Sequence, residues 1–273
     1  GSDFRRLTIE YVEQMGIPIK STHHEDGPSQ HEIDLQHMDA LSMADAVTTY
    51  RVADKQAARE LGAHATYMPH PLEDRPGSGM HLHMSLFSAE GNAFQSPDPG
   101  PPLSPLGSGF LAGVLAHGRE ITAVTNQWVN SYKRLALGYE APQHVGWTRH
   151  ARNGLVRVPS GRPGSTWATR IELRSPDPGC NPYLTFAIVL AAGLRGIKHG
   201  YELGPEDEDP PYRAGSLPED LREATDLFES SELAHDTFGE RLCEWYVRNK
   251  RREWEEFRKT VSAFERRRYL DVL

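Results

Sequence analysis

Two stretches in which polar and apolar residues alternate constrain the fold most strongly. The first, GMHLHMSLF, places two rows on opposite faces of an extended strand: His81, His83 and Ser85 against Met80, Leu82 and Met84. The second, TRIELRS, alternates Arg170, Glu172 and Arg174 with Ile171 and Leu173. Both patterns predict strands with one face packed into a core and the other face lining a cavity or meeting water.

The other segments follow no regular βαβ alternation, so we predict one α+β domain. Helices are expected at residues 3–15, 38–61, 105–124 and 182–197, a strand at 17–25, and extended chain at 65–70. Residues 126–175 are expected to mix loops and short strands. Residues 1–200 would form the sheet and active-site core. Residues 201–273 would form a C-terminal helical section with Leu242, Trp245 and Tyr246 on one face.

Composition excludes several classes of protein. The chain has 273 residues and a net charge of −8, which argues against a general nucleic-acid binder. No apolar run is long enough to span a bilayer, and no secretory leader opens the sequence. Cys180 and Cys243 are the only cysteines and form no disulfide framework. A cytoplasmic location is therefore expected.

Ligand-type side chains gather at the turn-like stretch HHEDGPSQHEI, which contains Glu25 and Glu32. Together with His81 and Glu172 they form an oxygen-rich set with one imidazole and no thiolate, which suits Mg²⁺ or Mn²⁺ better than structural zinc. The alternatives are a polar loop that only resembles a site, and a solvated strand face with cross-strand ion pairs.

Arginines are dense between residues 134 and 174, at Arg134, Arg149, Arg152, Arg157, Arg170 and Arg174. Guanidinium groups suit phosphate and carboxylate oxygens, although surface ion pairs are the alternative. Neither a Walker-type phosphate loop nor a GxGxxG stretch after a strand is present. The residues by themselves indicate an ATP-using, metal-dependent enzyme that acts on an anionic small molecule.

Five segments in order and spacing resemble the glutamine synthetase family: HHEDGPSQHEI, GSGMHLHMSL, VNSYKRLALGYEAP, RNGLVRVP and TRIELRSPDPGCNPYL. PGSGMH, TNQWVNSYKRL and RNKRREWEEFR look like its actinobacterial branch, which includes γ-glutamylpolyamine synthetases. The resemblance implies a catalytic domain with an antiparallel sheet flanked by helices. It also implies a ligase that phosphorylates the γ-carboxylate of glutamate with ATP, and an amine that then displaces phosphate.

The resemblance also implies roles for individual residues. Glu25 and Glu32 would hold one divalent metal, and His81 and Glu172 a second. His23, His24 and His31 are expected to support the ligands or the fold rather than to bind metal. The ATP-binding residues would be His83, Ser85, Arg152, Arg157 and Arg170. Glutamate would be bound by Gly77, Arg134, Glu140 and Arg174. The catalytic residues would be Arg152 and Glu140, the latter helping to deprotonate the amine.

The family's N-terminal β-grasp domain and first catalytic strand are not found in this sequence. The resemblance implies that residues 1–273 are the C-terminal part of the catalytic domain, in a ring-shaped homo-oligomer with active sites between subunits. We expect the chain alone to be inactive, because both metals would lack a ligand. The acceptor stays open between ammonia and a polyamine. A guanidino kinase is the alternative within the enzyme class, but such an enzyme is not expected to keep SYKRLALGYEAP. A non-catalytic structural or regulatory relative is the alternative from another class.

Overall fold

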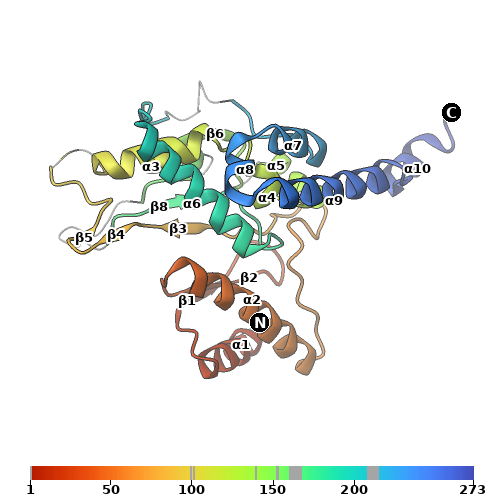
Figure 1. The fold of residues 1–273 in the computed structure, drawn as a ribbon. Coiled ribbons are helices and arrows are strands. Elements are labelled where there is room, and N and C mark those ends of the chain that lie inside the picture. The colour runs from red at the N-terminus through yellow and green to blue at the C-terminus, as the bar shows by residue number, and fades with distance from the viewer. Residues whose placement is uncertain are drawn as a thin grey trace.

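The protein consists of an N-terminal layer of two helices and a hairpin, set against a larger body that contains the central sheet (Figure 1). The structure is a computed structural model that describes residues 2–98, 100, 102–138, 140–151, 154–159, 168–207 and 215–273. Among the described helices, none combines the length and apolarity needed to cross a bilayer. The predicted α+β class is confirmed.

The N-terminal layer has four elements: α1 Ser2–Gln14, β1 Ile19–His24, β2 His31–Leu35 and α2 Ala40–Glu60. β1 and β2 pair antiparallel, with His23 opposite Glu32. α2 begins where Asp39 accepts a hydrogen bond from the Ser42 amide at 3.0 Å. It ends before Gly62, whose φ of +69° allows the chain to turn away as predicted.

A small core holds this layer together. It consists of Val12, Ile17, Ala46 and Ala53. Beside it, the buried Asp54 carboxylate accepts hydrogen bonds from the Thr8 hydroxyl at 3.2 Å and the Tyr67 hydroxyl at 2.7 Å. The segment at 65–70, predicted to be extended like a strand, joins no sheet. Its Tyr67 is held by this side-chain bond instead.

The central sheet has the strand order β3-β8-β7-β6. Its strands are β3 Leu82–Met84, β6 His144–Thr148, β7 Gly154–Arg157 and β8 Ile171–Leu173. β8 pairs antiparallel with both neighbours, and β6 runs parallel to β7. A separate hairpin joins β4 Phe87–Ser88 to β5 Gly91–Asn92. The two alternating stretches of the sequence thus meet as the neighbouring strands β3 and β8.

The sheet packs on a helical layer that contains α3 Pro105–Ala116, α4 Thr122–Thr125, α5 Val129–Leu137 and α6 Pro182–His199. α3 and α6 cross closely because glycines face each other. A Cβ at Gly113 would lie 2.2 Å from the Ala192 carbonyl oxygen, and one at Gly196 would lie 2.2 Å from the Gly109 oxygen. The predicted helix at 105–124 is therefore present but interrupted between α3 and α4.

The prediction that residues 126–175 contain only loops and short strands is wrong, because α5 lies within them. VNSYKRLAL begins with residues of modest helix propensity. Tertiary packing supplies the missing stability, since Tyr132 and Leu135 are buried on one side of the helix.

The C-terminal helices are α7 Leu221–Glu229, α8 Glu232–Phe238, α9 Glu240–Arg258 and α10 Ala263–Tyr269. α9 buries Cys243, Val247 and Lys250, whereas Leu242 and Trp245 are exposed. The packed face is therefore rotated from the predicted one, and of the predicted trio only Tyr246 packs on the core. The last part of α9 and α10 project from the body (Figure 1).

Lys250 ties α9 to the start of α5. Its buried Nζ donates to the Gln127 carbonyl at 2.8 Å and to Glu253 Oε2 at 2.9 Å. The same ammonium lies 4.4 Å from the centre of the Trp128 ring. Glu253 Oε1 in turn accepts a hydrogen bond from the Val129 amide, one of the unpaired donors at the N-terminus of α5.

Replacing Lys250 by Met should lower the free energy of unfolding by about 2–3 kcal/mol, because it leaves a half-buried carboxylate and a carbonyl without their partner. Urea denaturation measures the change. Arg252→Met is the matched control on the same helix, since its exposed i,i+4 pair with Glu256 contributes little. Equal effects of the two substitutions would contradict the assigned role of Lys250.

Candidate metal and anion-binding site

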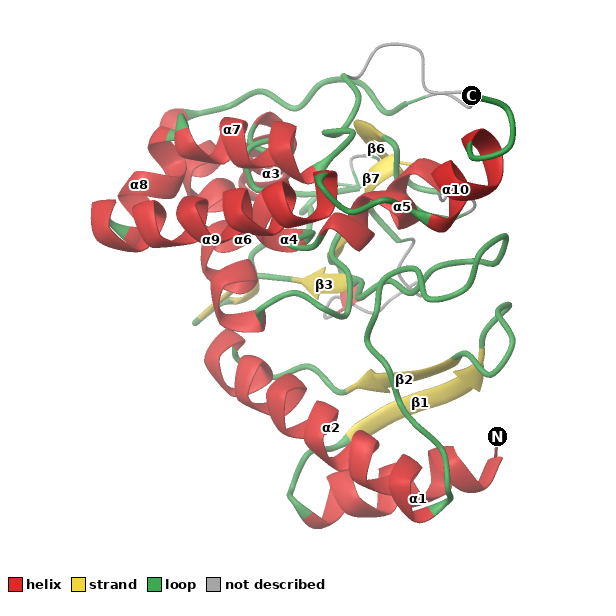
Figure 2. Cartoon of the chain, turned by 90° about the vertical axis from the view of Figure 1, so that its right-hand side faces the viewer, coloured by secondary structure: helices red, strands yellow, loops and turns green. Residues whose placement is uncertain are grey.

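A cavity of about 1840 Å³ lies between the N-terminal layer and the central sheet. One wall is the β1–β2 hairpin and its turn, and the other is the segment from Pro76 to Phe87. Arg134, Glu140 and Arg170 reach the cavity from other parts of the chain. Figure 2 shows the hairpin running below β3 with its turn at one end.

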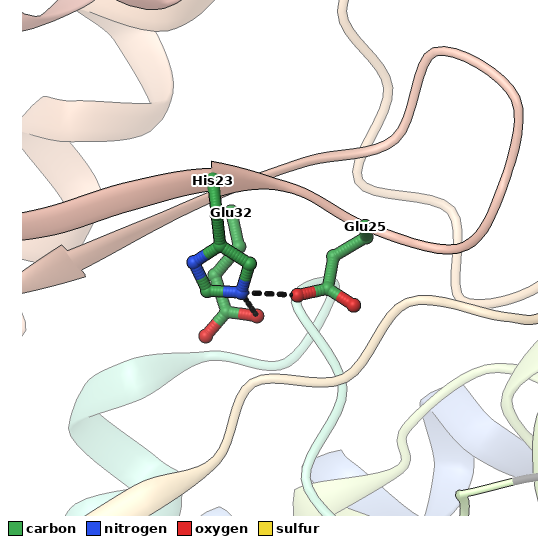
Figure 3. Close-up of side chains that lie close together, drawn as sticks. All are labelled: His23, Glu25 and Glu32. Atoms are coloured by element: carbon green, nitrogen blue, oxygen red, sulfur yellow. Dashed lines mark ion pairs between the residues drawn. The ribbon is translucent and has the colours of Figure 1, made fainter.

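The hairpin wall carries a cluster of three ligand-type side chains, His23, Glu25 and Glu32 (Figure 3). His23 Nε2 lies 2.5 Å from Glu25 Oε1 and 3.5 Å from Glu32 Oε2. His23 and Glu32 share a face because they are cross-strand partners, and Glu25 follows directly after β1. The structure thus brings together the two predicted carboxylates and places His23, which we expect to support the ligands or the fold, directly beside them.

The electrostatics of this cluster fit a divalent cation. Burial, with the neighbouring carboxylates of Glu25 and Asp34, raises the pKa of Glu32 to about 8. Crowded carboxylates repel one another, and a cation among them removes that repulsion. Carboxylate oxygens with one imidazole match the ligands of Mg²⁺ and Mn²⁺. The residues present therefore fit the expected kind of metal.

Next to the residues of the opposite wall is Glu172, the register partner of His83 and only 1% exposed. Arg174 Nη1 lies 2.6 Å from its Oε1, and Arg157 Nη2 lies 2.6 Å from its Oε2. Burial opposes ionisation, but the neighbouring His83, Arg174, His81 and Arg157 groups hold the pKa of Glu172 below its ordinary value. Glu172 is therefore a carboxylate at neutral pH.

His81 lies beside this carboxylate, with Nδ1 3.4 Å from Glu172 Oε1. Burial, assisted by Arg174 and Arg134, lowers the pKa of His81 to about 3. A neutral imidazole keeps a lone pair for a metal. His81 and Glu172 thus form a second pair of possible ligands, although both Glu172 oxygens already accept from arginines.

The residues expected to bind ATP lie around the pairing of β3 with β8. His83 is opposite Glu172 in the register, and its Nδ1 lies 3.1 Å from Arg170 Nε. The Ser85 hydroxyl donates to the Thr169 carbonyl at 2.8 Å. His83, Ser85 and Arg170 all line the cavity. Arg152 lies outside the described residues. Arg149 instead pairs with Glu206.

Arg134 is almost fully buried, and its guanidinium holds the chain that follows β8. Nη1 donates to the Ser175 carbonyl at 2.7 Å, and Nη2 donates to the Arg174 carbonyl at 3.1 Å. The glycines of GSGMH make room for it. A Cβ at Gly77 would lie 2.8 Å from Arg134 Cγ, and one at Gly79 would lie 2.6 Å from Arg134 Nη2. Gly77 and Arg134 are thus neighbours, as their shared predicted role requires.

Arg174 joins this group to the loop after α5, because its Nη2 donates to the Glu140 carbonyl at 3.0 Å. Glu140 is exposed and reaches the cavity. Most of the described residues of the predicted metal and substrate sets therefore line one cavity. Glu172, Arg157 and Arg174 are not among the lining residues and form an ion-pair group next to His81.

Comparison with known proteins agrees with this arrangement. Residues 1–269 match the family described as "Glutamine synthetase, catalytic domain". The chain belongs to the glutamine synthetase family. It is 49% identical to the glutamine synthetase of Mycolicibacterium smegmatis over 280 aligned positions, which cover 99% of this chain and 63% of that protein. Identity to the Methanosarcina mazei glutamine synthetase is 44%, covering 98% of this chain and 62% of the relative.

Two solved structures have the same fold. The structure titled "Apo GmaS without ligand" matches with a TM-score of 0.88 and 32% identity, covering 98% of this chain and 63% of that one. The structure titled "GmaS/ADP complex-Conformation 1" matches with a TM-score of 0.89, also at 32% identity, covering 98% and 64%. The chain thus spans about 63% of the length of the Mycolicibacterium smegmatis glutamine synthetase and of the ligand-free GmaS chain.

Two polar residues that line the cavity were not predicted from the sequence, Asp34 and Gln30. Asp34 is two positions beyond Glu32 on β2 and forms a short hydrogen bond with the Ser21 hydroxyl. The period of two in a strand could have placed it on the carboxylate face. Gln30, in the turn, bonds across to Gly77. No local pattern indicates that contact, because its partner is 47 residues away.

Substituting Gly79 by Ala should destabilise the fold by about 1–3 kcal/mol, since the new methyl group meets the fixed Arg134 guanidinium and approaches His81 Nε2 at 3.2 Å. Gly204→Ala is the control, because nothing lies within 4 Å of a Cβ there. Equal unfolding free energies for both variants would show that the guanidinium moves aside without cost.

Metal binding at the hairpin should release about one proton per cation near pH 7, because Glu32 is protonated below its raised pKa of about 8 and must ionise to bind. Without metal, the raised pKa of Glu32 makes the free energy of unfolding fall as the pH rises from the pKa of Glu32 in the unfolded chain towards 8. Calorimetric Mn²⁺ titrations in buffers of different ionisation enthalpy count the protons. Glu32→Gln should abolish that proton release.

Proposed function

We propose that the protein joins ammonia or an amine to the γ-carboxylate of L-glutamate at the expense of ATP, through γ-glutamyl phosphate. The observation that carries this proposal is that Glu25 and Glu32 lie on one wall of a cavity and His81, with its neighbour Glu172, lies at the other, in a chain of the glutamine synthetase family. Arg134 and Arg170 also line this cavity. The relative whose title names an ADP complex supports ATP as the phosphoryl donor.

In this proposal two cations, Mg²⁺ or Mn²⁺, would be held by Glu25 and Glu32 on the hairpin and by His81 and Glu172 on the sheet. Bound divalent cations supply positive charge that offsets the charge of phosphate oxygens. His23 contributes a third possible ligand on the hairpin side. The Glu172 carboxylate would exchange one of its arginine bonds for the cation.

The remaining roles follow from the chemistry of each group. His83, Ser85, Arg157 and Arg170, together with Arg152, would bind ATP. Gly77, Arg134 and Arg174 would position glutamate, Arg134 through the carbonyls that it holds. A γ-carboxylate oxygen of glutamate then attacks the terminal phosphorus, and ADP leaves. The amine attacks the acyl carbon and phosphate leaves, while Glu140 accepts the proton that the amine loses.

The acceptor decides which member of the family this is. The test uses the complete natural protein with ATP, Mg²⁺ and glutamate, and follows phosphate release with ammonium, ethanolamine, putrescine or spermine, with the product identified by mass. Preference for ammonium identifies a glutamine synthetase. Preference for a polyamine identifies a γ-glutamylpolyamine synthetase. Absence of acceptor-dependent phosphate release overturns the proposal in favour of a non-catalytic relative. A separate measurement of particle size in solution tests the expected ring-shaped homo-oligomer.

Glu32→Gln should lower acceptor-dependent phosphate release by ~100-fold or more, because it removes one ionised ligand from the hairpin cluster. Glu13→Gln makes the same chemical change on the exposed side of α1 and should leave the rate unchanged. If the two variants retain equal activity, the hairpin carboxylates do not take part in the reaction.

A further inference from the structure

Gln30, in the turn between β1 and β2, uses both ends of its side-chain amide. Its Oε1 accepts a hydrogen bond from the Gly27 amide at 2.9 Å, which closes the turn onto itself. Its Nε2 donates to the Gly77 carbonyl and to the Ser78 hydroxyl, each at 3.0 Å. One half-buried amide therefore spans from the carboxylate hairpin to the opposite wall of the cavity.

Both ends of this bridge lead directly to the ligand-type side chains. On the hairpin side, the Glu25 amide donates to the Gln30 carbonyl at 3.0 Å, and Glu32 is two residues further along. On the other side, Gly77 and Ser78 precede His81 by only a few residues. The Ser78 amide is fixed to the Pro69 carbonyl at 2.8 Å, and the Met80 amide to the Pro176 carbonyl at 2.8 Å.

The local sequence is fitted to this side chain. A Cβ at Gly27 would lie 2.6 Å from Gln30 Oε1, so any larger residue there would displace the glutamine amide from its present position. The position needs an acceptor for the Gly27 amide and donors for two oxygens, and a primary amide supplies both on separate atoms. Glutamate would offer acceptors alone, and leucine would offer neither.

We propose that Gln30 is a positioning residue that couples the two walls of the site. Ordering of the hairpin by a cation at Glu25 and Glu32 fixes the turn, and the Gln30 amide passes that order to Gly77 and Ser78, which hold His81 in place. The inference rests on the metal binding of the proposed function, and it assigns a specific path by which one ligand set controls the other.

The test follows hydrogen exchange of the complete natural protein while Mn²⁺ is added. In the unmodified protein, Mn²⁺ should slow exchange in peptides that cover residues 25–32 and also in those that cover 77–83. Gln30→Leu should keep the slowing in the first segment, lose it in the second, and weaken Mn²⁺ binding by about tenfold, as seen for residues that orient metal ligands. No catalytic turnover is needed for this readout.

Gln36→Leu is the matched control, because Gln36 follows the same hairpin and its side chain makes a single exposed hydrogen bond among the described residues, 3.3 Å to the Ile19 carbonyl. It should behave like the unmodified protein. Gln30→Glu covers the case in which the leucine variant does not fold, since it keeps the bond from Gly27 and replaces the donor to Gly77 with an acceptor. It should uncouple residues 77–83 in the same way.

The outcomes separate the two proposals. Absence of any Mn²⁺ effect in the unmodified protein would remove the metal site of the proposed function. Mn²⁺ binding that leaves residues 77–83 unchanged, or a Gln30 variant that responds like the Gln36 control, would overturn the coupling alone. A drop in thermal stability with both segments still protected by Mn²⁺ would show that Gln30 is merely structural.

Discussion

A buried carboxylate between two guanidinium groups is the interaction on which the rest of the site depends. Glu172 forms ion pairs with Arg157 on the neighbouring strand β7 and with Arg174, which directly follows β8. Removing one partner from such a group leaves a charge in a medium that cannot solvate it. The pairing therefore fixes the register of β7 and β8 and sets the position of His81 and His83 beside them.

α5 extends this order to the edge of the cavity. Its N-terminus is capped from α9 by Glu253, its middle holds the chain after β8 through Arg134, and its C-terminus leads to Glu140. A helix of nine residues, too short to be stable alone, is thus held by two separate parts of the chain. The C-terminal section, far from the chemistry in sequence, stabilises residues that face glutamate in the proposed reaction.

The sequence predicts the local features of this site well and its long-range features poorly. Alternation along GMHLHMSLF correctly separates buried Leu82 from exposed His83, because strand periodicity is a local property. The pairing of His83 with Glu172 and the bridge from Gln30 to Gly77 join residues far apart in the chain, and no local pattern contains them. The rotated face of α9 has the same origin, since burial of Lys250 depends on Trp128 and Gln127. The position of His23 opposite Glu32 has the same origin, because it depends on the strand register.

The small core beneath the hairpin has a consequence for affinity. Alanines and two aliphatic side chains bury little apolar surface compared with the large cluster under the sheet. The free energy needed to open the layer that carries Glu25 and Glu32 is therefore lower than that needed to open the sheet. A cation bound there as proposed would use part of its intrinsic binding free energy to keep the layer closed. The apparent dissociation constant is then inversely proportional to the fraction of molecules in which this layer is closed. Substitutions between α1 and α2 will alter ion affinity without touching a ligand.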